Sequence, residues 1–130
     1  MIVLDASAVT EVLLRLSAVA AVERRVHDMR ETLHAPHFID LEVAHVVRRY
    51  VMRGEIAEER GRLAIEGLAD FPMNRHPHVD LLPRIWQLRH NLSAYDAAYV
   101  ALAETLDAPL VTRDRRLAAS SGHRARIELL

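Results

Sequence analysis

Apolar and polar positions divide the chain into short apolar runs and longer segments with helical periodicity. Apolar residues that recur every three or four positions predict helices, and short β-branched runs between turn residues predict buried strands. Strands are predicted at 1–4, 33–35, 109–112 and 127–130, with a further short strand inside the loop at 71–78. Helices are predicted at 9–16, 18–30, 39–53, 56–69, 79–90 and 93–106, and a turn with a short helix at 113–120. Strands that alternate with helices predict a three-layer α/β/α fold around a central, mostly parallel sheet.

Length and composition fit a single globular domain that spans residues 1–130. The chain is 51% hydrophobic and 27% charged, as in ordinary globular proteins. Its longest apolar runs, such as 97–103, are far shorter than the roughly 18 residues that a membrane span needs. The segment 1–5 lacks the basic region of a signal peptide, and the chain has no cysteine. We therefore expect a protein of the cytoplasm that does not associate with membranes.

The charges give no global sign of a nucleic-acid binder, because the formal net charge is −1. All 17 basic residues are Arg and none is Lys. This bias has two alternative explanations. One is the codon composition of a GC-rich genome, and the other is the use of Arg for bidentate phosphate contacts. In either case, mechanisms that need a lysine are excluded.

Two acids lie just after predicted strands. Asp5 comes after the first strand, and Asp114 comes after the strand at 109–112. The carboxyl ends of parallel strands meet at one rim of a sheet, where functional side chains collect. Either acid alone is also explained as a cap of the helix or turn that follows it.

Two further acids border apolar helix stripes. On a helix, Glu42 has Ile39 and Val46 as neighbours on its own face, and Asp96 has Tyr99 and Val100. An acid that faces the interior costs several kcal/mol, by rough estimate, unless it is paired or bound to a metal. For Asp96 a helix-capping box with Ser93 is the alternative explanation.

Together these four carboxylates predict a site for a hard divalent cation. Mg²⁺ prefers carboxylate oxygens, keeps several waters and often binds substrate phosphates, and Mn²⁺ is a possible substitute. A cation of this kind activates water for hydrolysis of a phosphodiester bond. That chemistry suits a chain without a nucleophilic Cys or Lys.

Four segments resemble one known family. They are Met1-Ile2-Val3-Leu4-Asp5-Ala6-Ser7-Ala8, Leu41-Glu42-Val43, Ser93-Ala94-Tyr95-Asp96-Ala97-Ala98-Tyr99-Val100-Ala101-Leu102-Ala103-Glu104 and Leu110-Val111-Thr112-Arg113-Asp114. In this order they are similar to the PIN-domain family, specifically the VapC-type toxin ribonucleases of type II toxin–antitoxin systems. The third segment is the most specific, and the resemblance extends over essentially the whole chain.

The resemblance implies a PIN-like fold and a role for each matching residue. Asp5, Glu42 and Asp96 match the acids that hold the metal, and Asp114 matches a fourth acid that often acts through water. Ser7 and Thr112 match hydroxyl residues that support the site. The resemblance also implies a Mg²⁺-dependent endoribonuclease that cleaves structured RNA, a homodimer and a cognate VapB-type antitoxin.

Other residues support less specific interpretations. Three arginines flank Asp114: Arg113, Arg115 and Arg116. They are candidates for RNA phosphate contacts, or they form a solvated basic turn. Tyr95 and Tyr99 are expected to pack, although a tyrosine near the rim can stack on a base. Trp86 is expected in core or dimer packing. The eight His residues form no HExxH pattern and have no Cys partner, which argues against zinc.

Three rival functions remain for comparison. A phosphate-receiving regulator needs an acidic pair after the first strand and a Lys after the last, and a phosphatase with an aspartyl nucleophile needs Asp-x-Asp, whereas this chain has Asp5-Ala6-Ser7 and no Lys. The third is a non-catalytic PIN-like module that binds RNA or protein. The presence of all four acids argues against this module without establishing activity.

Overall fold

A five-stranded sheet forms the centre of the molecule. The computed structural model describes residues 1–27 and 31–130, so the end of the helix predicted at 18–30 lies outside the described residues. The strands are β1 (Ile2–Leu4), β2 (Leu33–Pro36), β3 (Met73–His76), β4 (Leu110–Thr112) and β5 (Ile127–Leu129). They lie in the order β3-β2-β1-β4-β5, and every neighbouring pair is parallel. The predicted parallel sheet is confirmed.

The helices follow the predicted segments. They are α1 (Ala6–Leu14), α2 (Val19–Val26), α3 (Ile39–Met52), α4 (Glu58–Ala69), α5 (Leu82–Gln87), α6 (Ala94–Leu106) and α7 (Arg115–Ala118), with a 3₁₀ turn η1 (Val79–Leu81) before α5. The segment predicted as one helix at 79–90 is therefore divided. Pro83 lies at the start of α5, where a missing N–H is tolerated, and the residues before it form the tighter 3₁₀ turn.

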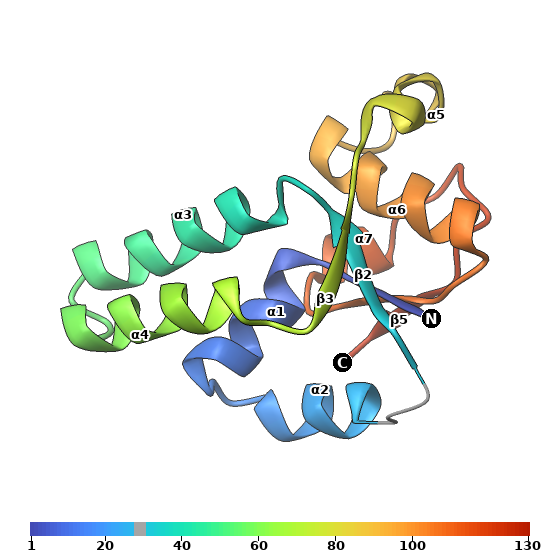
Figure 1. Ribbon diagram of the computed structural model, residues 1–130. Helices are drawn as coiled ribbons and strands as arrows, with labels where there is room; N and C mark the ends of the chain where they lie inside the picture. Colours follow the sequence, from blue (N-terminus) through green and yellow to red (C-terminus); the bar gives the residue numbers. More distant parts are fainter. Residues whose placement is uncertain (28–30) are drawn as a thin grey trace.

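The helices cover the two faces of the sheet. Figure 1 shows α1 to α4 on one side and α5 and α6 on the other, with α3 and α4 projecting as an antiparallel pair. On one face α1 packs against β4, and on the other α6 packs against β1, β2 and β4. The three-layer α/β/α prediction is confirmed.

The central strand and α6 form much of the core. All three residues of β1 are fully buried, as expected for a strand that helices cover on both faces. In α6, every residue from Ala97 to Ala103 is buried, which explains why this helix reads as an almost continuous apolar run. No helix among the described residues is long and apolar enough to cross a lipid bilayer.

The path of the chain creates a switch point between β1 and β4. From β1 the chain adds β2 and β3 on one side, and it then crosses over to add β4 and β5 on the other. Ligands of open parallel sheets bind outside the carboxyl ends of the strands at such a switch point. Asp5 and Asp114 follow the two strands that flank it.

A buried histidine on β2, His34, contacts a half-buried histidine on β3, His76. His34 is 8% exposed, and its Nδ1 lies 2.7 Å from Nε2 of His76, while its Nε2 lies 2.7 Å from the Thr32 hydroxyl. Burial, the neighbouring His76 and the N-terminal amino group lower the pKa of His34. The surroundings of His34 therefore favour its neutral ring more than those of an exposed histidine do.

We expect this pair to make the protein less stable at acidic pH. The pKa of His34 is lower in the folded chain than the unfolded value near 6.5, so the unfolded chain takes up the proton first. This contribution to stability is complete above about pH 6.5 and is lost as the pH falls towards the lowered folded pKa, by at most about 1.4 kcal/mol per pH unit. Thermal unfolding between about pH 8 and 5.5 measures it. The loss of stability at acidic pH should be smaller in His34→Asn, and it should persist in the exposed control His27→Asn. If stability falls equally steeply with pH in both variants, the prediction is contradicted.

Candidate active site

Asp5 links the end of β1 to the beginning of α1. Its Oδ1 accepts hydrogen bonds from the Ala8 backbone N–H (3.0 Å) and the Ser7 hydroxyl (2.7 Å), and its Oδ2 accepts one from the Thr112 hydroxyl (2.5 Å). Asp5 is thus the helix cap that the sequence allowed. Because a carboxylate oxygen can accept two hydrogen bonds, Oδ2 keeps one acceptor position for a ligand.

The Asp5 carboxylate is held where its negative charge is costly. The residue is 5% exposed, and burial raises the pKa of its carboxyl group. The bonds from Thr112, Ser7 and Ala8 lower this pKa in part, and the charge of Asp114 raises it again. The net result is a raised pKa, so a cation next to Asp5 would stabilise its ionised form.

Ser7 and Thr112 tie Asp5 to the loop after β4. The Ser7 hydroxyl accepts a hydrogen bond from the Arg113 backbone N–H (2.8 Å), and the Thr112 hydroxyl accepts one from the Asp114 backbone N–H (2.9 Å). Both hydroxyls also donate to Asp5, and they lie 3.4 Å from each other. The two hydroxyls thus connect the Asp5 carboxylate to the backbone of the loop after β4.

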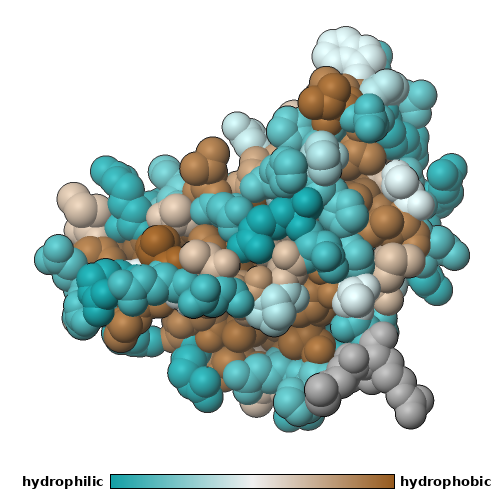
Figure 2. All heavy atoms as spheres, viewed as in Figure 1, coloured by the Kyte–Doolittle hydropathy of each residue, from teal (hydrophilic) through white to brown (hydrophobic). Residues whose placement is uncertain are grey.

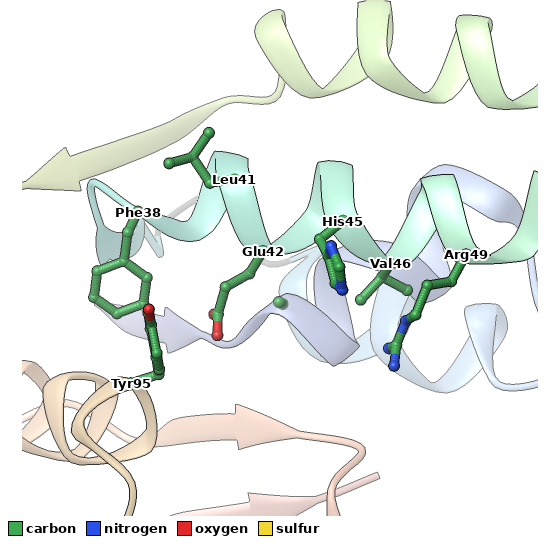
Figure 3. A pocket seen from close by; sticks show the side chains of 8 residues that line it. Phe38, Leu41, Glu42, His45, Val46, Arg49 and Tyr95 are labelled. Carbon is green, nitrogen blue, oxygen red and sulfur yellow. The ribbon is translucent and has the colours of Figure 1, made fainter.

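Glu42 reaches the site from the first turn of α3. Its Oε2 accepts a hydrogen bond of 2.6 Å from the Tyr99 hydroxyl, which α6 supplies from the opposite face of the sheet. Burial raises the pKa of Glu42, the Tyr99 bond lowers it, and the charges of Asp96 and Asp5 raise it again. In Figure 3 the side chain points from α3 into an open pocket.

Asp96 lies in the first turn of α6 and is half-buried. Its backbone N–H donates to the Ser93 hydroxyl (3.1 Å), which is one half of the capping box that the sequence allowed. Within the described part of the chain, the Asp96 carboxylate itself has no hydrogen bond or ion pair. The cap therefore depends on Ser93 and the backbone, and the carboxylate is available for another ligand.

Asp114 caps α7, the short helix after β4. Its Oδ1 accepts hydrogen bonds from the backbone N–H groups of Arg116 (2.7 Å) and Leu117 (3.4 Å), and its Oδ2 lies 3.5 Å from the Arg116 guanidinium. The capping explanation thus holds for Asp114 as it does for Asp5. A cap and a rim carboxylate are compatible, because both follow from a position directly after a strand.

The four acids are electrostatically connected. The charge of Asp114 acts on Asp5, and the charges of Asp5 and Asp96 act on Glu42. Asp5 and Asp114 lie just after the ends of β1 and β4, and Glu42 and Asp96 lie in the first turns of α3 and α6.

Comparison with known proteins identifies the family of this chain. The sequence profile of the PIN domain matches residues 2–121. Ribonuclease VapC1 of Mycobacterium tuberculosis is 46% identical over 130 residues, which cover 98% of this chain and 96% of VapC1. Ribonuclease VapC12 of the same organism is 45% identical over 100% of this chain and 99% of its own length. The chain belongs to the PIN-domain family of VapC ribonucleases.

Two solved structures share the fold of this chain. PAE2754 from Pyrobaculum aerophilum superimposes with a TM-score of 0.69 at 26% identity, over 97% of this chain and 81% of that protein. VapC20 of M. tuberculosis, a toxin that cleaves the sarcin–ricin loop, superimposes with a TM-score of 0.71 over 95% and 97% of the two chains. At 14% identity the second likeness concerns the fold alone. The resemblance noted in the sequence is confirmed.

The donor set of this PIN domain fits a hard divalent cation. Among the described residues, no three His, Asp or Glu side chains already converge closely enough to enclose an ion. Mg²⁺ does not require such a cage, because it keeps several waters and needs only one or two carboxylates together with substrate phosphate. The free acceptor position on Asp5 and the unpaired carboxylate of Asp96 meet that requirement.

The three arginines predicted to contact RNA differ in their surroundings. Arg115 and Arg116 are exposed on α7, and Arg116 also pairs with Asp114. Arg113 turns inward, where its guanidinium donates to Glu11 (3.4 Å) and to the Leu130 backbone carbonyl. Arg115 and Arg116 are thus freer than Arg113 to meet a phosphate.

Sequence reasoning missed two residues beside the site. Glu11 is buried, and it accepts hydrogen bonds from the Ala18 backbone (3.0 Å) and from Arg113. Its only signal was a single acid within the apolar run of the first helix. Tyr99 was expected to pack, and it does, but its hydroxyl also binds Glu42.

We expect Tyr99→Phe to weaken metal binding while the fold persists. The ring stays packed edge-to-face against Phe38 (centroids 5.5 Å apart), but the donor that orients Glu42 is lost. Loss of a partner that orients a ligand raises the half-saturating Mg²⁺ concentration roughly 10-fold. Calorimetric Mn²⁺ titration measures affinity independently of cleavage. Tyr50→Phe on α3 is the matched control, and equal affinities for the two variants contradict a positioning role for Tyr99.

Proposed function

We propose that this PIN domain is a Mg²⁺-dependent endoribonuclease, for which Mn²⁺ can substitute, and the toxin component of a VapBC-type toxin–antitoxin system. It hydrolyses RNA phosphodiester bonds with water as the nucleophile. The family supports a nuclease, since the VapC relatives are named ribonucleases. An RNA substrate also agrees with the cytoplasmic location that we expect from the sequence.

One observation carries this proposal. Burial raises the pKa values of Asp5 and Glu42, and the negative charges of neighbouring acids raise them further. A protein maintains such repulsion at a cost, which a bound cation removes. Carboxylates gathered at a switch point, without a Cys or Lys nucleophile, support metal-assisted hydrolysis by water.

Each residue has a distinct role in the proposed mechanism. Asp5 and Asp96 hold the cation, and Glu42 and Asp114 complete the acidic set either directly or through water. Ser7 and Thr112 keep the Asp5 oxygens oriented through their hydroxyls. When bound, the cation supplies a lowered pKa for water and neutralises charge on the scissile phosphate. The exposed Arg115 and Arg116, with Arg113 behind them, contact RNA phosphates next to the acids.

A cleavage assay separates this enzyme from a non-catalytic binding module. Purified protein is incubated with end-labelled RNA hairpins and single strands in Mg²⁺, in parallel with Asp5→Asn prepared in the same way. Asn is as good a helix cap as Asp, so the variant should fold and lose activity. If the protein binds RNA but shows no cleavage that depends on Asp5, the enzyme is refuted and the non-catalytic binding module is retained.

We further propose that a VapB-type antitoxin inhibits by covering the acids. An Arg side chain from the antitoxin matches paired carboxylates and competes with the cation. Apolar side chains exposed on the projecting α3–α4 pair offer a surface for an accompanying amphipathic helix: Leu41, Met52, Leu63 and Ile65. Figure 2 shows hydrophobic side chains among polar ones over this part of the molecule.

Calorimetric titration with the antitoxin tests this inhibition. The wild type and Asp5→Asn/Asp96→Asn are compared at two salt concentrations. Neutralising the acids should weaken binding and reduce its salt dependence. Unchanged affinity and salt dependence mean that inhibition does not act through the acids.

We also propose a homodimer. Val79, Leu82 and Trp86 are 65%, 50% and 68% exposed along η1 and α5, so Trp86 is not a core residue. Their spacing of three and four places them on one face that a second copy can cover. Sedimentation equilibrium of the purified chain measures its mass, and a monomer at micromolar concentration refutes the dimer.

A further inference from the structure

A pocket of about 510 Å³ opens directly beside Glu42. Its walls are the first turns of α3, residue Ala6 of α1 and the beginning of α6 (Figure 3). The volume lies within the range of small-molecule sites, roughly 300 to 1,000 Å³. We call it the Tyr95 pocket, after the aromatic residue that α6 contributes.

One wall of the pocket is aromatic. The Tyr95 ring meets Phe38 edge-to-face, with centroids 5.4 Å apart and an interplanar angle of 82°. Phe38 is in turn packed edge-to-face against the buried Tyr99. This contact supports the Tyr95 ring from behind, yet the residue stays 58% exposed. A supported, exposed aromatic ring is a platform on which a nucleobase can stack.

Another wall carries positive charge. His45 and Arg49 follow Glu42 at three and seven positions along α3, and Figure 3 shows all three side chains pointing to the same side. Arg49 is exposed, and its guanidinium has no ion pair within the described ranges 1–27 and 31–130. The rise of a helix separates Arg49 from Glu42 by about 10 Å. A phosphate at Arg49 would therefore lie close to the acids without competing for them.

We propose that the Tyr95 pocket binds one nucleotide of single-stranded RNA next to the cleaved bond, with its base on Tyr95 and a flanking phosphate on Arg49. This inference rests on the proposed ribonuclease function and adds a substrate subsite to it. Tyr95 and Glu42 line the same pocket, so a base stacked on the Tyr95 ring lies beside this acid.

A nucleotide suits this pocket better than an apolar peptide. A wholly apolar occupant would remove Glu42 and Arg49 from water without giving either a partner, which is costly. A nucleotide brings an aromatic face for Tyr95 and Phe38 and an anion for Arg49. It also leaves the Glu42 side of the pocket open towards the scissile phosphate.

Binding of a fluorescent single-stranded RNA octamer, followed by anisotropy in EDTA, tests the subsite without cleavage. Tyr95→Ala should weaken binding roughly 5- to 100-fold, and Tyr95→Phe should bind like the wild type. Arg49→Ala should weaken binding and reduce the salt slope by roughly 0.7. Arg48→Ala should do neither, because Arg48 faces the separate groove between α3 and α4.

An octamer with one abasic position completes the test. When the abasic site is moved along the octamer, one position should weaken binding to the wild type. The same abasic octamer should bind Tyr95→Ala no more weakly than the intact octamer does. Unchanged RNA affinity of Tyr95→Ala overturns the subsite, and so does an equal effect of Arg48→Ala and Arg49→Ala. A Tyr95→Ala variant that loses affinity for the antitoxin but not for RNA assigns the pocket to the protein partner, and also overturns it.

Cleavage in Mg²⁺ distinguishes failure of the subsite from failure of the proposed function. If the wild type cleaves RNA and Tyr95→Ala does so with unchanged KM, the ribonuclease stands and the subsite falls. If the wild type cleaves no RNA but binding still depends on Tyr95 and the base, the nuclease falls and the nucleotide pocket stands.

Discussion

Asp96→Asn is expected to abolish RNA cleavage and to leave the protein at least as stable as the wild type. Removing one carboxylate that holds the cation costs several kcal/mol of transition-state stabilisation, a rate loss of roughly 1,000-fold or more. Stability should not suffer, because the Ser93 hydroxyl accepts its hydrogen bond from the backbone of residue 96, which Asn retains. Repulsion between position 96 and Glu42 also disappears.

Initial cleavage rates and thermal unfolding without metal measure both halves of this prediction. Asp107→Asn is the matched control, since Asp107 is exposed at the other end of the same helix. Its backbone has a φ of 47°, a left-handed conformation that Asn tolerates. Full activity in Asp96→Asn refutes its role in the site. Severe unfolding of this variant means instead that the carboxylate is needed for the helix cap.

Chelation of divalent cations is expected to stop cleavage completely. Excess EDTA should abolish activity, and Mg²⁺ or Mn²⁺ but not Zn²⁺ should restore it, because the site offers carboxylates without Cys or a spaced His motif. Full cleavage in excess EDTA contradicts the proposed mechanism. A control with sodium chloride at the ionic strength of the EDTA solution shows whether salt alone affects cleavage.

The dependence on metal should also vary with pH. Asp5 and Glu42 have raised pKa values, and a carboxylate binds the cation only when it is deprotonated. Protons therefore compete with Mg²⁺ at higher pH than they would for ordinary acids, so the half-saturating Mg²⁺ concentration should begin to rise at a higher pH than it does for ordinary carboxylates as the pH falls. Cleavage rates over a matrix of pH and Mg²⁺ measure this shift. A half-saturating concentration that does not change with pH refutes the coupling.

The same acids link metal to stability. A carboxyl group with a raised folded pKa contributes stability below its unfolded pKa, and this stability is lost as the pH rises through the folded pKa. Ionisation of Asp5 and Glu42 as the pH rises thus weakens the metal-free fold. Mg²⁺ should raise the unfolding temperature of the wild type at pH 7, and it should do so less in Asp96→Asn.

Local chemistry along the chain was enough to predict the fold and the four acids. The strand before Asp5 and the strand before Asp114 are short apolar runs that end in a polar residue, and α6 begins at a Ser that caps it. Parallel pairing then brings the two strand ends to one rim. The misplaced acids Glu42 and Asp96 were visible because an acid beside an apolar stripe violates helical periodicity.

The partners of these side chains were decided only by tertiary structure. Tyr99 and Glu42 lie 57 positions apart, and α3 and α6 approach from opposite faces of the sheet, so no periodicity in either helix predicts their hydrogen bond. Arg113 follows a strand like a rim residue, yet it turns to Glu11 because α1 packs beside β4. Periodicity determines which face of an element is apolar, whereas the rotation and approach of packed elements determine which side chains meet. The pairing of His34 with His76 and the exposed face of Tyr95 have the same origin.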